Sequence, residues 1–157
     1  MKNKLKAIIP SVIVVIAALF GINLSTNDIE QVQNDFVVHS YQIEKDGSYY
    51  SKEDVALYIN TYGVLPSNFI KKAEARNLGW QGGTVEQVAP GKAIGGDKFY
   101  NNEGSLPEKS GRIYTECDIN TLGKDSRGAE RIVFSNDGLV YYTANHYETF
   151  ELLYGIP

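Results

Sequence analysis

The sequence has few of the residues from which small proteins build covalent or metal-bound sites. One cysteine and two histidines occur in 157 residues, which excludes an internal disulfide framework and a cysteine-rich zinc site. The spacings of a P-loop, an HExxH zinc motif, an EF-hand and a G-x-S-x-G nucleophile turn are also absent from the sequence. We therefore expect no cofactor and no motif-held metal ion.

The chain also lacks an excess of positive charge. Its 15 Lys and Arg residues stand against 19 Asp and Glu residues, and the formal net charge is −4. Sequence-independent binding to nucleic acid relies on Lys and Arg, so this balance argues against a general nucleic-acid binder. Hydrophobic residues make up 43% of the chain and 11 residues are tyrosine. This composition excludes a disordered protein and favours one ordinary globular domain.

The first 48 residues are predicted to lie outside that domain. Three lysines at the N-terminus precede an uncharged run over residues 7–24, which is typical of an export signal. The run is 18 residues long, at the lower limit for spanning a bilayer, so residues 1–24 could be a cleaved signal peptide or a retained signal anchor. Residues 25–48 are polar and irregular, and we expect a pro-segment or linker there.

Residues 49–157 are predicted to form one α+β domain that begins with helices. Ser51 stands at the N-cap position of an amphipathic stripe, and Gly63 would end this first helix. A second helix is expected over Lys71–Leu78, and a short helical turn near Thr84–Val88.

Strands are predicted in the second half of the domain. Glycines and prolines after Pro90 predict a loop-rich stretch, and alternating segments begin at Arg112. We expect strands over Arg112–Ile119, Arg131–Ser135, Leu139–Thr143 and near Glu148–Leu153. The order of the elements favours an α+β fold with N-terminal helices packed on a C-terminal antiparallel sheet.

A small set of polar residues could carry phosphodiester chemistry. Glu116 points off the apolar face of its strand, and His146 follows another strand in a turn. A carboxylate and a histidine across one sheet face can act as a general base and a general acid. Arg127 and Arg131 lie four residues apart, and planar guanidinium groups suit phosphate oxygens. A solvated polar sheet face would look similar. Cys117 alternates with isoleucines and is expected in the core.

Strings of residues along nearly the whole domain match a known family. They include Leu65–Ala75, Leu78–Trp80, Val88–Asp97, Asn101–Gly104, Lys109–Arg112, Glu116–Asn120 and Asn145–Phe150. In order and spacing, the chain from about Ser51 to Leu153 resembles the barnase-like family of secreted bacterial guanyl-preferring ribonucleases. The resemblance implies the microbial ribonuclease fold and cleavage of single-stranded RNA after guanosine, without a metal ion or a cofactor.

The resemblance also implies roles for particular residues. Glu116 would be the general base that removes the proton of the ribose 2′-OH, and His146 would be the general acid that protonates the departing 5′-oxygen. Lys72, Arg127 and Arg131 would hold the scissile phosphate and stabilise its added negative charge. The product would be a 2′,3′-cyclic phosphate that is hydrolysed in a second step.

A guanine-reading loop is implied as well. Its members are Phe99, Tyr100, Asn101, Asn102 and Glu103, and Tyr147 would steer the base or the phosphate. Glu103 would accept hydrogen bonds from the guanine N1–H and N2–H₂ groups. Tyr100 and Asn102 depart from the family's pattern, which usually has a serine and an arginine there. The missing arginine weakens the inference that a barstar-like inhibitor is a partner.

Two other functions stay open at this point. The domain could be an antibacterial ribonuclease toxin delivered by a partner, or a non-catalytic RNA- or protein-binding member of the fold. We expect a secreted monomer that binds RNA and not DNA, and that meets a membrane only through residues 7–24 if these are not cleaved. Lys72, Arg112, Arg127, Arg131 and His146 are expected to converge on one sheet face. There a local positive field would capture phosphate despite the acidic total.

Overall fold

The computed structural model describes residues 25, 27 and 43–157, and residues 43–157 belong to one compact unit. The export signal and most of the pro-segment that the sequence predicts lie outside the described residues. Within the described part of the chain, no helix is long and apolar enough to cross a membrane.

The compact unit begins ahead of the predicted domain boundary at residue 49. Ile43 is 8% exposed and belongs to the hydrophobic core. The hydroxyls of Tyr62 and Tyr58 donate to the carbonyls of Ile43 and Lys45, both at 2.8 Å. These contacts tie the segment before residue 49 to the first helix of the domain.

Helix α3 spans Lys52–Tyr62, as its capping pattern predicts. The Ser51 hydroxyl accepts a hydrogen bond from the Asp54 N–H at 3.1 Å, which satisfies a backbone donor in the first turn. The helix ends at Gly63, whose φ of 71° lies in the left-handed region that glycine adopts without strain.

The two other predicted helical segments are also present. Helix α4 spans Lys72–Asn77, and a 3₁₀ turn, η1, spans Val85–Gln87. The residue before α4, Lys71, makes no side-chain cap. Instead Asp97, from a neighbouring strand, accepts a hydrogen bond from the Lys72 N–H at 3.0 Å.

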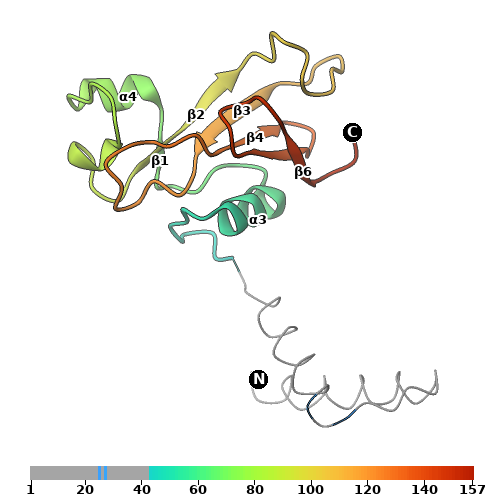
Figure 1. Cartoon of the computed structure of the whole chain (residues 1–157), viewed down its shortest axis with the longest axis horizontal. Coiled ribbons are helices and arrows are strands. Elements are labelled where there is room, and N and C mark those ends of the chain that lie inside the picture. Colours follow the sequence, from blue (N-terminus) through green and yellow to red (C-terminus); the bar gives the residue numbers. More distant parts are fainter. Residues whose placement is uncertain (1–24, 26, 28–42) are drawn as a thin grey trace. The chain divides into compact units, whose positions relative to one another are not determined.

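Six strands form one mixed sheet in which each strand pairs with the next in sequence (Figure 1). They are β1 (Phe69–Ile70), β2 (Ala93–Phe99), β3 (Tyr114–Asp118), β4 (Arg131–Ser135), β5 (Val140–Thr143) and β6 (Glu151–Tyr154). The strands predicted over residues 112–119, 131–135 and 139–143 are confirmed, with β3 shorter than expected. The prediction of a purely antiparallel sheet was wrong, because β1 pairs with β2 in parallel.

Strand β2 lies in the stretch that the sequence analysis described as loop-rich, so that prediction was also wrong. The sequence pattern did not indicate this strand, because its glycines interrupt the alternation of apolar and polar side chains. A Cβ atom on Gly95 would lie 2.6 Å from the Cβ of Cys117, so the close approach of β2 to β3 requires glycine there. Gly96 has a φ of 96° and lies at a register shift between Gly95 and Asp97.

Each face of the sheet carries a hydrophobic cluster. On one face α3 packs against the sheet, with Val55, Ile59, Cys117, Ile132 and Phe134 buried. On the opposite face lie Leu106, Tyr114, Val133, Leu139 and Tyr141. Because both faces of β4 are covered, all of its residues are buried. Cys117 is 1% exposed, as predicted, and burial raises the pKa of its thiol. The architecture is α+β with a mixed sheet.

Candidate active site

The sheet face opposite α3 carries two carboxylates on one strand. Glu116 and Asp118 lie two positions apart in β3, so their side chains point to the same face. The register pairs Glu116 with Val133 and Asp118 with Arg131. The Glu116 side chain is 12% exposed, whereas that of Asp118 is 2% exposed. Glu116 can therefore meet a substrate, and Asp118 can act only through its neighbours.

Lys72 reaches Glu116 from the first residue of α4. The Lys72 Nζ lies 2.5 Å from Glu116 Oε1. Asp97, which binds the Lys72 N–H, is also the partner of Glu116 in the register between β2 and β3. An acidic side chain at the start of a helix is favourable because it meets unpaired backbone N–H groups. Asp97 thus fixes the backbone of Lys72, from which the side-chain ammonium extends to Glu116.

Tyr147 holds the second oxygen of Glu116. The Tyr147 hydroxyl donates to Glu116 Oε2 at 2.5 Å. Burial, and then the hydrogen bond to Glu116, raises the pKa of the Tyr147 hydroxyl above its ordinary value of 10.0, so this group is a donor at neutral pH. Its backbone N–H donates to Thr143 Oγ1 at 3.0 Å. Both oxygens of Glu116 are therefore bound, which fixes the orientation of the carboxylate.

His146 lies in a turn whose backbone is strained. His146 and Tyr147 have φ angles of 54° and 77°, in the left-handed region that is costly for residues with a side chain. The His146 N–H donates to the Ala129 carbonyl at 3.1 Å, and the His146 and Tyr147 rings have centroids 4.7 Å apart. The residue is exposed. The turn therefore presents an accessible imidazole beside the tyrosine that binds Glu116.

Arg127 and Arg131 converge on Asp118. Arg127 donates to the carboxylate through Nε at 2.5 Å and Nη2 at 2.8 Å. Arg131 Nε forms an ion pair with Asp118 Oδ1 at 2.8 Å, without the alignment of a hydrogen bond, and Arg131 Nη1 donates to the carbonyls of Arg127 and Glu130. Hydrogen bonding to Asp118 raises the pKa of the Arg127 guanidinium. Two guanidinium groups share one carboxylate, so the cluster keeps a positive charge in excess.

A cavity of about 440 Å³ adjoins Tyr147, and all five residues of the predicted guanine-reading loop line it. His146 and Tyr147 line the same cavity. Asn101 closes the loop: its side chain donates to the Leu106 carbonyl and accepts from the Leu106 N–H, both at 2.9 Å. The Phe99 ring packs 5.2 Å from that of Tyr147. The loop is thereby joined to the residues around Glu116.

The structure brings the predicted site residues into two adjoining groups, with one exception. Lys72, Glu116, Arg127 and Arg131 gather around β3, and residues 99–103, His146 and Tyr147 line the cavity. Arg112 lies apart. It binds Asp137 at 2.9 Å and the Pro107 carbonyl at 3.0 Å. The prediction that Arg112 joins the others was wrong, because β3 begins at Tyr114 and the alternation does not extend back to Arg112.

Two residues that position the site were missed in the sequence analysis. The alternation of β3 places Asp118 on the same face as Glu116, but its contacts with the arginine pair depend on tertiary structure. Asp97 lay in a stretch that was interpreted as a loop. The available signal was the pair of carboxylates at alternate positions of β3, because a buried carboxylate needs a cationic partner.

Comparison with known proteins identifies the family. A model of the ribonuclease family matches residues 52–154. A ribonuclease of Bacillus intermedius is 42% identical over 128 residues, which cover 80% of this chain and 75% of that protein. A ribonuclease of Heyndrickxia coagulans is 49% identical over 100 residues, covering 62% of this chain and 91% of that protein. Guanyl-specific ribonuclease St of Saccharopolyspora erythraea is 42% identical over 57 residues, which cover 36% of this chain and 56% of that protein. The chain belongs to the ribonuclease family and is an endoribonuclease.

Proposed function

We propose that this ribonuclease cleaves single-stranded RNA preferentially after guanosine, outside the cell and without a metal ion, through a 2′,3′-cyclic phosphate. The observation that carries the proposal is the Glu116 carboxylate, which is held by Lys72 and Tyr147 on the face that bears the arginine pair. A fixed carboxylate, a positive cluster and an exposed imidazole are the parts that such a reaction requires.

In the first step Glu116 accepts the proton of the ribose 2′-OH, and the 2′-oxygen attacks the adjacent phosphorus. The bond from phosphorus to the 5′-oxygen of the next nucleotide breaks, and His146 donates a proton to that oxygen. In the second step a water molecule opens the cyclic phosphate to a 3′-phosphate, and the two residues exchange roles. General acid–base catalysis of this kind contributes about 10²–10⁴-fold to the rate.

The cationic residues stabilise the negative charge that grows on the phosphate oxygens. The side chains of Lys72 and Arg127 are 29% and 24% exposed, so both can contact these oxygens. The Arg131 side chain is 3% exposed, and it acts mainly through its charge and its grip on Asp118. Preorganised cations in a partly water-excluded site lower the barrier without reorganising during the reaction.

Guanine preference is assigned to the loop that lines the cavity. Glu103 is exposed there and accepts hydrogen bonds from the guanine N1–H and N2–H₂ groups. The name of one relative, guanyl-specific ribonuclease St, supports this assignment. Asn102 adds no charge, so the loop reads the base by hydrogen bonds and ring contacts.

The proposal extends to the surroundings of the domain. Residues 1–24 direct export, the domain acts as a monomer, and its helices and sheet have the barnase-like arrangement. A barstar-like inhibitor that depended on an arginine in the guanine loop would bind this protein weakly, because Asn102 stands in its place.

Digestion of a defined RNA by the purified protein in excess EDTA tests the proposal. We expect cyclic phosphate ends after guanosine, and a loss of at least about 100-fold for Glu116→Gln and for His146→Ala. Glu53→Gln, on the exposed first turn of α3, is the matched control and should retain full activity. Sensitivity to EDTA, cleavage without base preference, or activity that survives both substitutions would contradict the proposal.

A further inference from the structure

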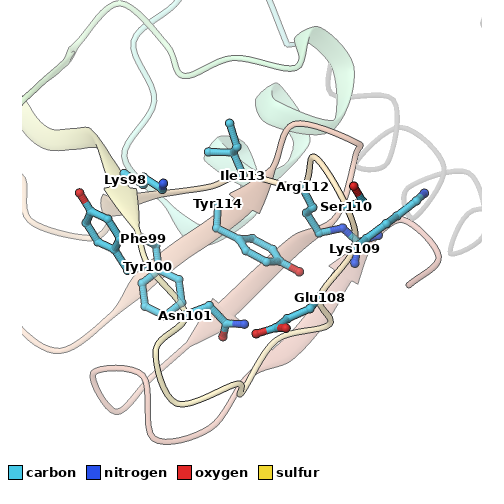
Figure 2. Close-up of a pocket in the computed structure, with 10 residues that line it drawn as sticks. All are labelled: Lys98, Phe99, Tyr100, Asn101, Glu108, Lys109, Ser110, Arg112, Ile113 and Tyr114. Atoms are coloured by element: carbon cyan, nitrogen blue, oxygen red, sulfur yellow. The ribbon is translucent and has the colours of Figure 1, made fainter.

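A second cavity, of about 570 Å³, is lined by the ten residues drawn in Figure 2, and it adjoins the first through the loop residues that the two share. Both are lined by Phe99, Tyr100 and Asn101. The second cavity contains neither His146 nor Tyr147, and its other walls come from the end of β2 and from residues 108–114. It therefore lies next to the proposed guanine site but away from the reacting groups.

One wall of this second cavity presents an aromatic ring and an ammonium group together. Tyr100 is 69% exposed, and the Lys98 Nζ lies 4.9 Å from the centroid of its ring. Figure 2 shows the two side chains side by side at one edge of the cavity. Lys98 forms no ion pair with another described residue, so its charge is not neutralised by a carboxylate. Such a pair offers a stacking surface for a base and a contact for a phosphate.

The opposite wall adds positive charge. Arg112 is bound to Asp137 and shapes this wall, while Lys109 lies 3.5 Å from the same carboxylate with its side chain 66% exposed. Together with Lys98 these cations outnumber Asp137 and the lining residue Glu108 by one. The cavity is therefore locally positive, although the chain as a whole is acidic, and it favours an anionic ligand.

We propose that this second cavity binds the nucleotide on the 5′ side of the guanosine, with its base on Tyr100 and its linking phosphate at Lys98. The inference rests on the proposed guanine site. The 3′-phosphate of the bound guanosine lies at Glu116 and His146, so the RNA that follows the guanosine leaves in that direction. A cavity that shares the guanine loop but excludes His146 is reached by the RNA that precedes it.

Cleavage of three short substrates tests the subsite. GpA lacks a 5′ extension, pGpA adds the phosphate, and ApGpA adds phosphate and base. We expect kcat/KM for ApGpA to exceed that for GpA by about tenfold, the effect of one stacked base and one phosphate contact. Tyr100→Ala should lower the ratio of kcat/KM for ApGpA to kcat/KM for pGpA. Only ApGpA has a 5′ base that stacks on Tyr100, and an effect on the guanosine that both substrates share cancels in this ratio.

Lys98→Gln separates the phosphate contact from the stacking contact. It should lower kcat/KM for ApGpA and pGpA by about threefold and leave GpA unchanged, because GpA has no phosphate at this position. For ApGpA, it should also reduce the slope of log(kcat/KM) against log salt concentration by about 0.7. For GpA, this slope should not change. Lys45→Gln removes an exposed positive charge that lines neither cavity, and should change none of these values.

The outcomes distinguish this inference from the proposed function. Equal kcat/KM values for GpA and ApGpA, or an equal loss on both substrates in Lys98→Gln, would overturn the subsite and leave the guanosine-specific cleavage intact. A protein that cleaves none of the three substrates would overturn the proposed function, and the subsite with it.

Discussion

Two aspartates of the domain each bind cationic side chains, and only one of them lies at the candidate active site. Asp118 binds Arg127 and Arg131 on the central strands of the sheet, and its side chain is 2% exposed. Asp137 lies in the turn between β4 and β5 and binds Arg112 and Lys109, and its side chain is 30% exposed. The partners are of the same kind, but the surroundings differ.

The comparison shows that burial decides what each cluster can do. Water reaches Asp137 and Lys109, whose side chains are 30% and 66% exposed, although the Arg112 side chain is only 4% exposed. This cluster is therefore screened more than the cluster at Asp118 and contributes less to stability. In the buried cluster, the loss of one member leaves the others uncompensated in a site that water reaches poorly. The buried cluster can therefore hold a fixed positive charge beside Glu116, whereas the cluster at Asp137 holds Arg112 and Lys109 at the wall of the second cavity.

The largest effect is expected from Asp118→Asn. It leaves the buried Arg131 with a neutral partner, and the free energy of unfolding should fall by about 3–5 kcal/mol. Cleavage of GpA should fall by more than about tenfold as well, because the arginines lose their fixed positions. Urea denaturation and initial rates measure the two effects. A variant with the stability and rate of the unchanged protein would show that the buried cluster is not needed.

A smaller effect is expected when one arginine of each cluster becomes lysine. Arg131→Lys loses the hydrogen bonds to the carbonyls of Arg127 and Glu130, and should cost about 1–3 kcal/mol of unfolding free energy. Arg112→Lys keeps a cation beside Asp137, a carboxylate that water also reaches, and should have a lesser effect. Thermal unfolding of the two variants side by side tests this order, and a greater loss in Arg112→Lys would reverse the comparison.

Asp137→Asn should have a modest effect that depends on pH. Hydrogen bonds from Arg112 and Ser135 hold the pKa of the Asp137 carboxyl well below its ordinary value of 3.8. The folded state therefore favours the ionised form, and this stabilisation is present above about pH 4 and is lost as the pH falls through the lower, folded pKa. The difference in Tm from the unchanged protein should be largest at neutral pH and narrow in acid, while cleavage of GpA at pH 7 stays unchanged. A difference that does not vary with pH would contradict the assignment.

The smallest effect is the response of the two clusters to salt. At 1 M salt the screening length falls to about 3 Å, so the destabilisation caused by Asp137→Asn should shrink. The destabilisation caused by Asp118→Asn should change less, because the Asp118 and Arg131 side chains are only 2% and 3% exposed. Urea midpoints at low and high salt measure both. Equal salt dependence would show that the two clusters are equally accessible to solvent.

The elements that were predicted correctly depend on local patterns. Helix α3 follows from the cap at Ser51, its apolar stripe and the stop at Gly63, and strands β4 and β5 were expected over Arg131–Ser135 and Leu139–Thr143. Strand β2 was missed because its glycines serve contacts with β3 and carry no local signal. The parallel pairing of β1 was missed because a strand of two residues shows no period.

The candidate site was predictable in its members and not in its connections. The resemblance pointed to Glu116, His146, Lys72 and the arginine pair. Their contacts could not be read from spacing, because Lys72 and Glu116 are 44 positions apart and Tyr147 lies 31 positions beyond Glu116. Arg112 was expected at the site and lies elsewhere. The alternation was extended beyond the start of β3 at Tyr114, and this placed Arg112 with the residues around Glu116.

The sequence by itself determined the cap and the stop of α3, strands β4 and β5, the ribonuclease family and the candidate site residues, because each depends on residue types at short or fixed spacing. Only the tertiary structure decided which aspartate became the buried partner of the arginines, which oxygens of Glu116 are bound, and that two cavities share one loop. Those properties depend on burial and on distances between segments far apart in the chain, and both arise only when the sheet has formed.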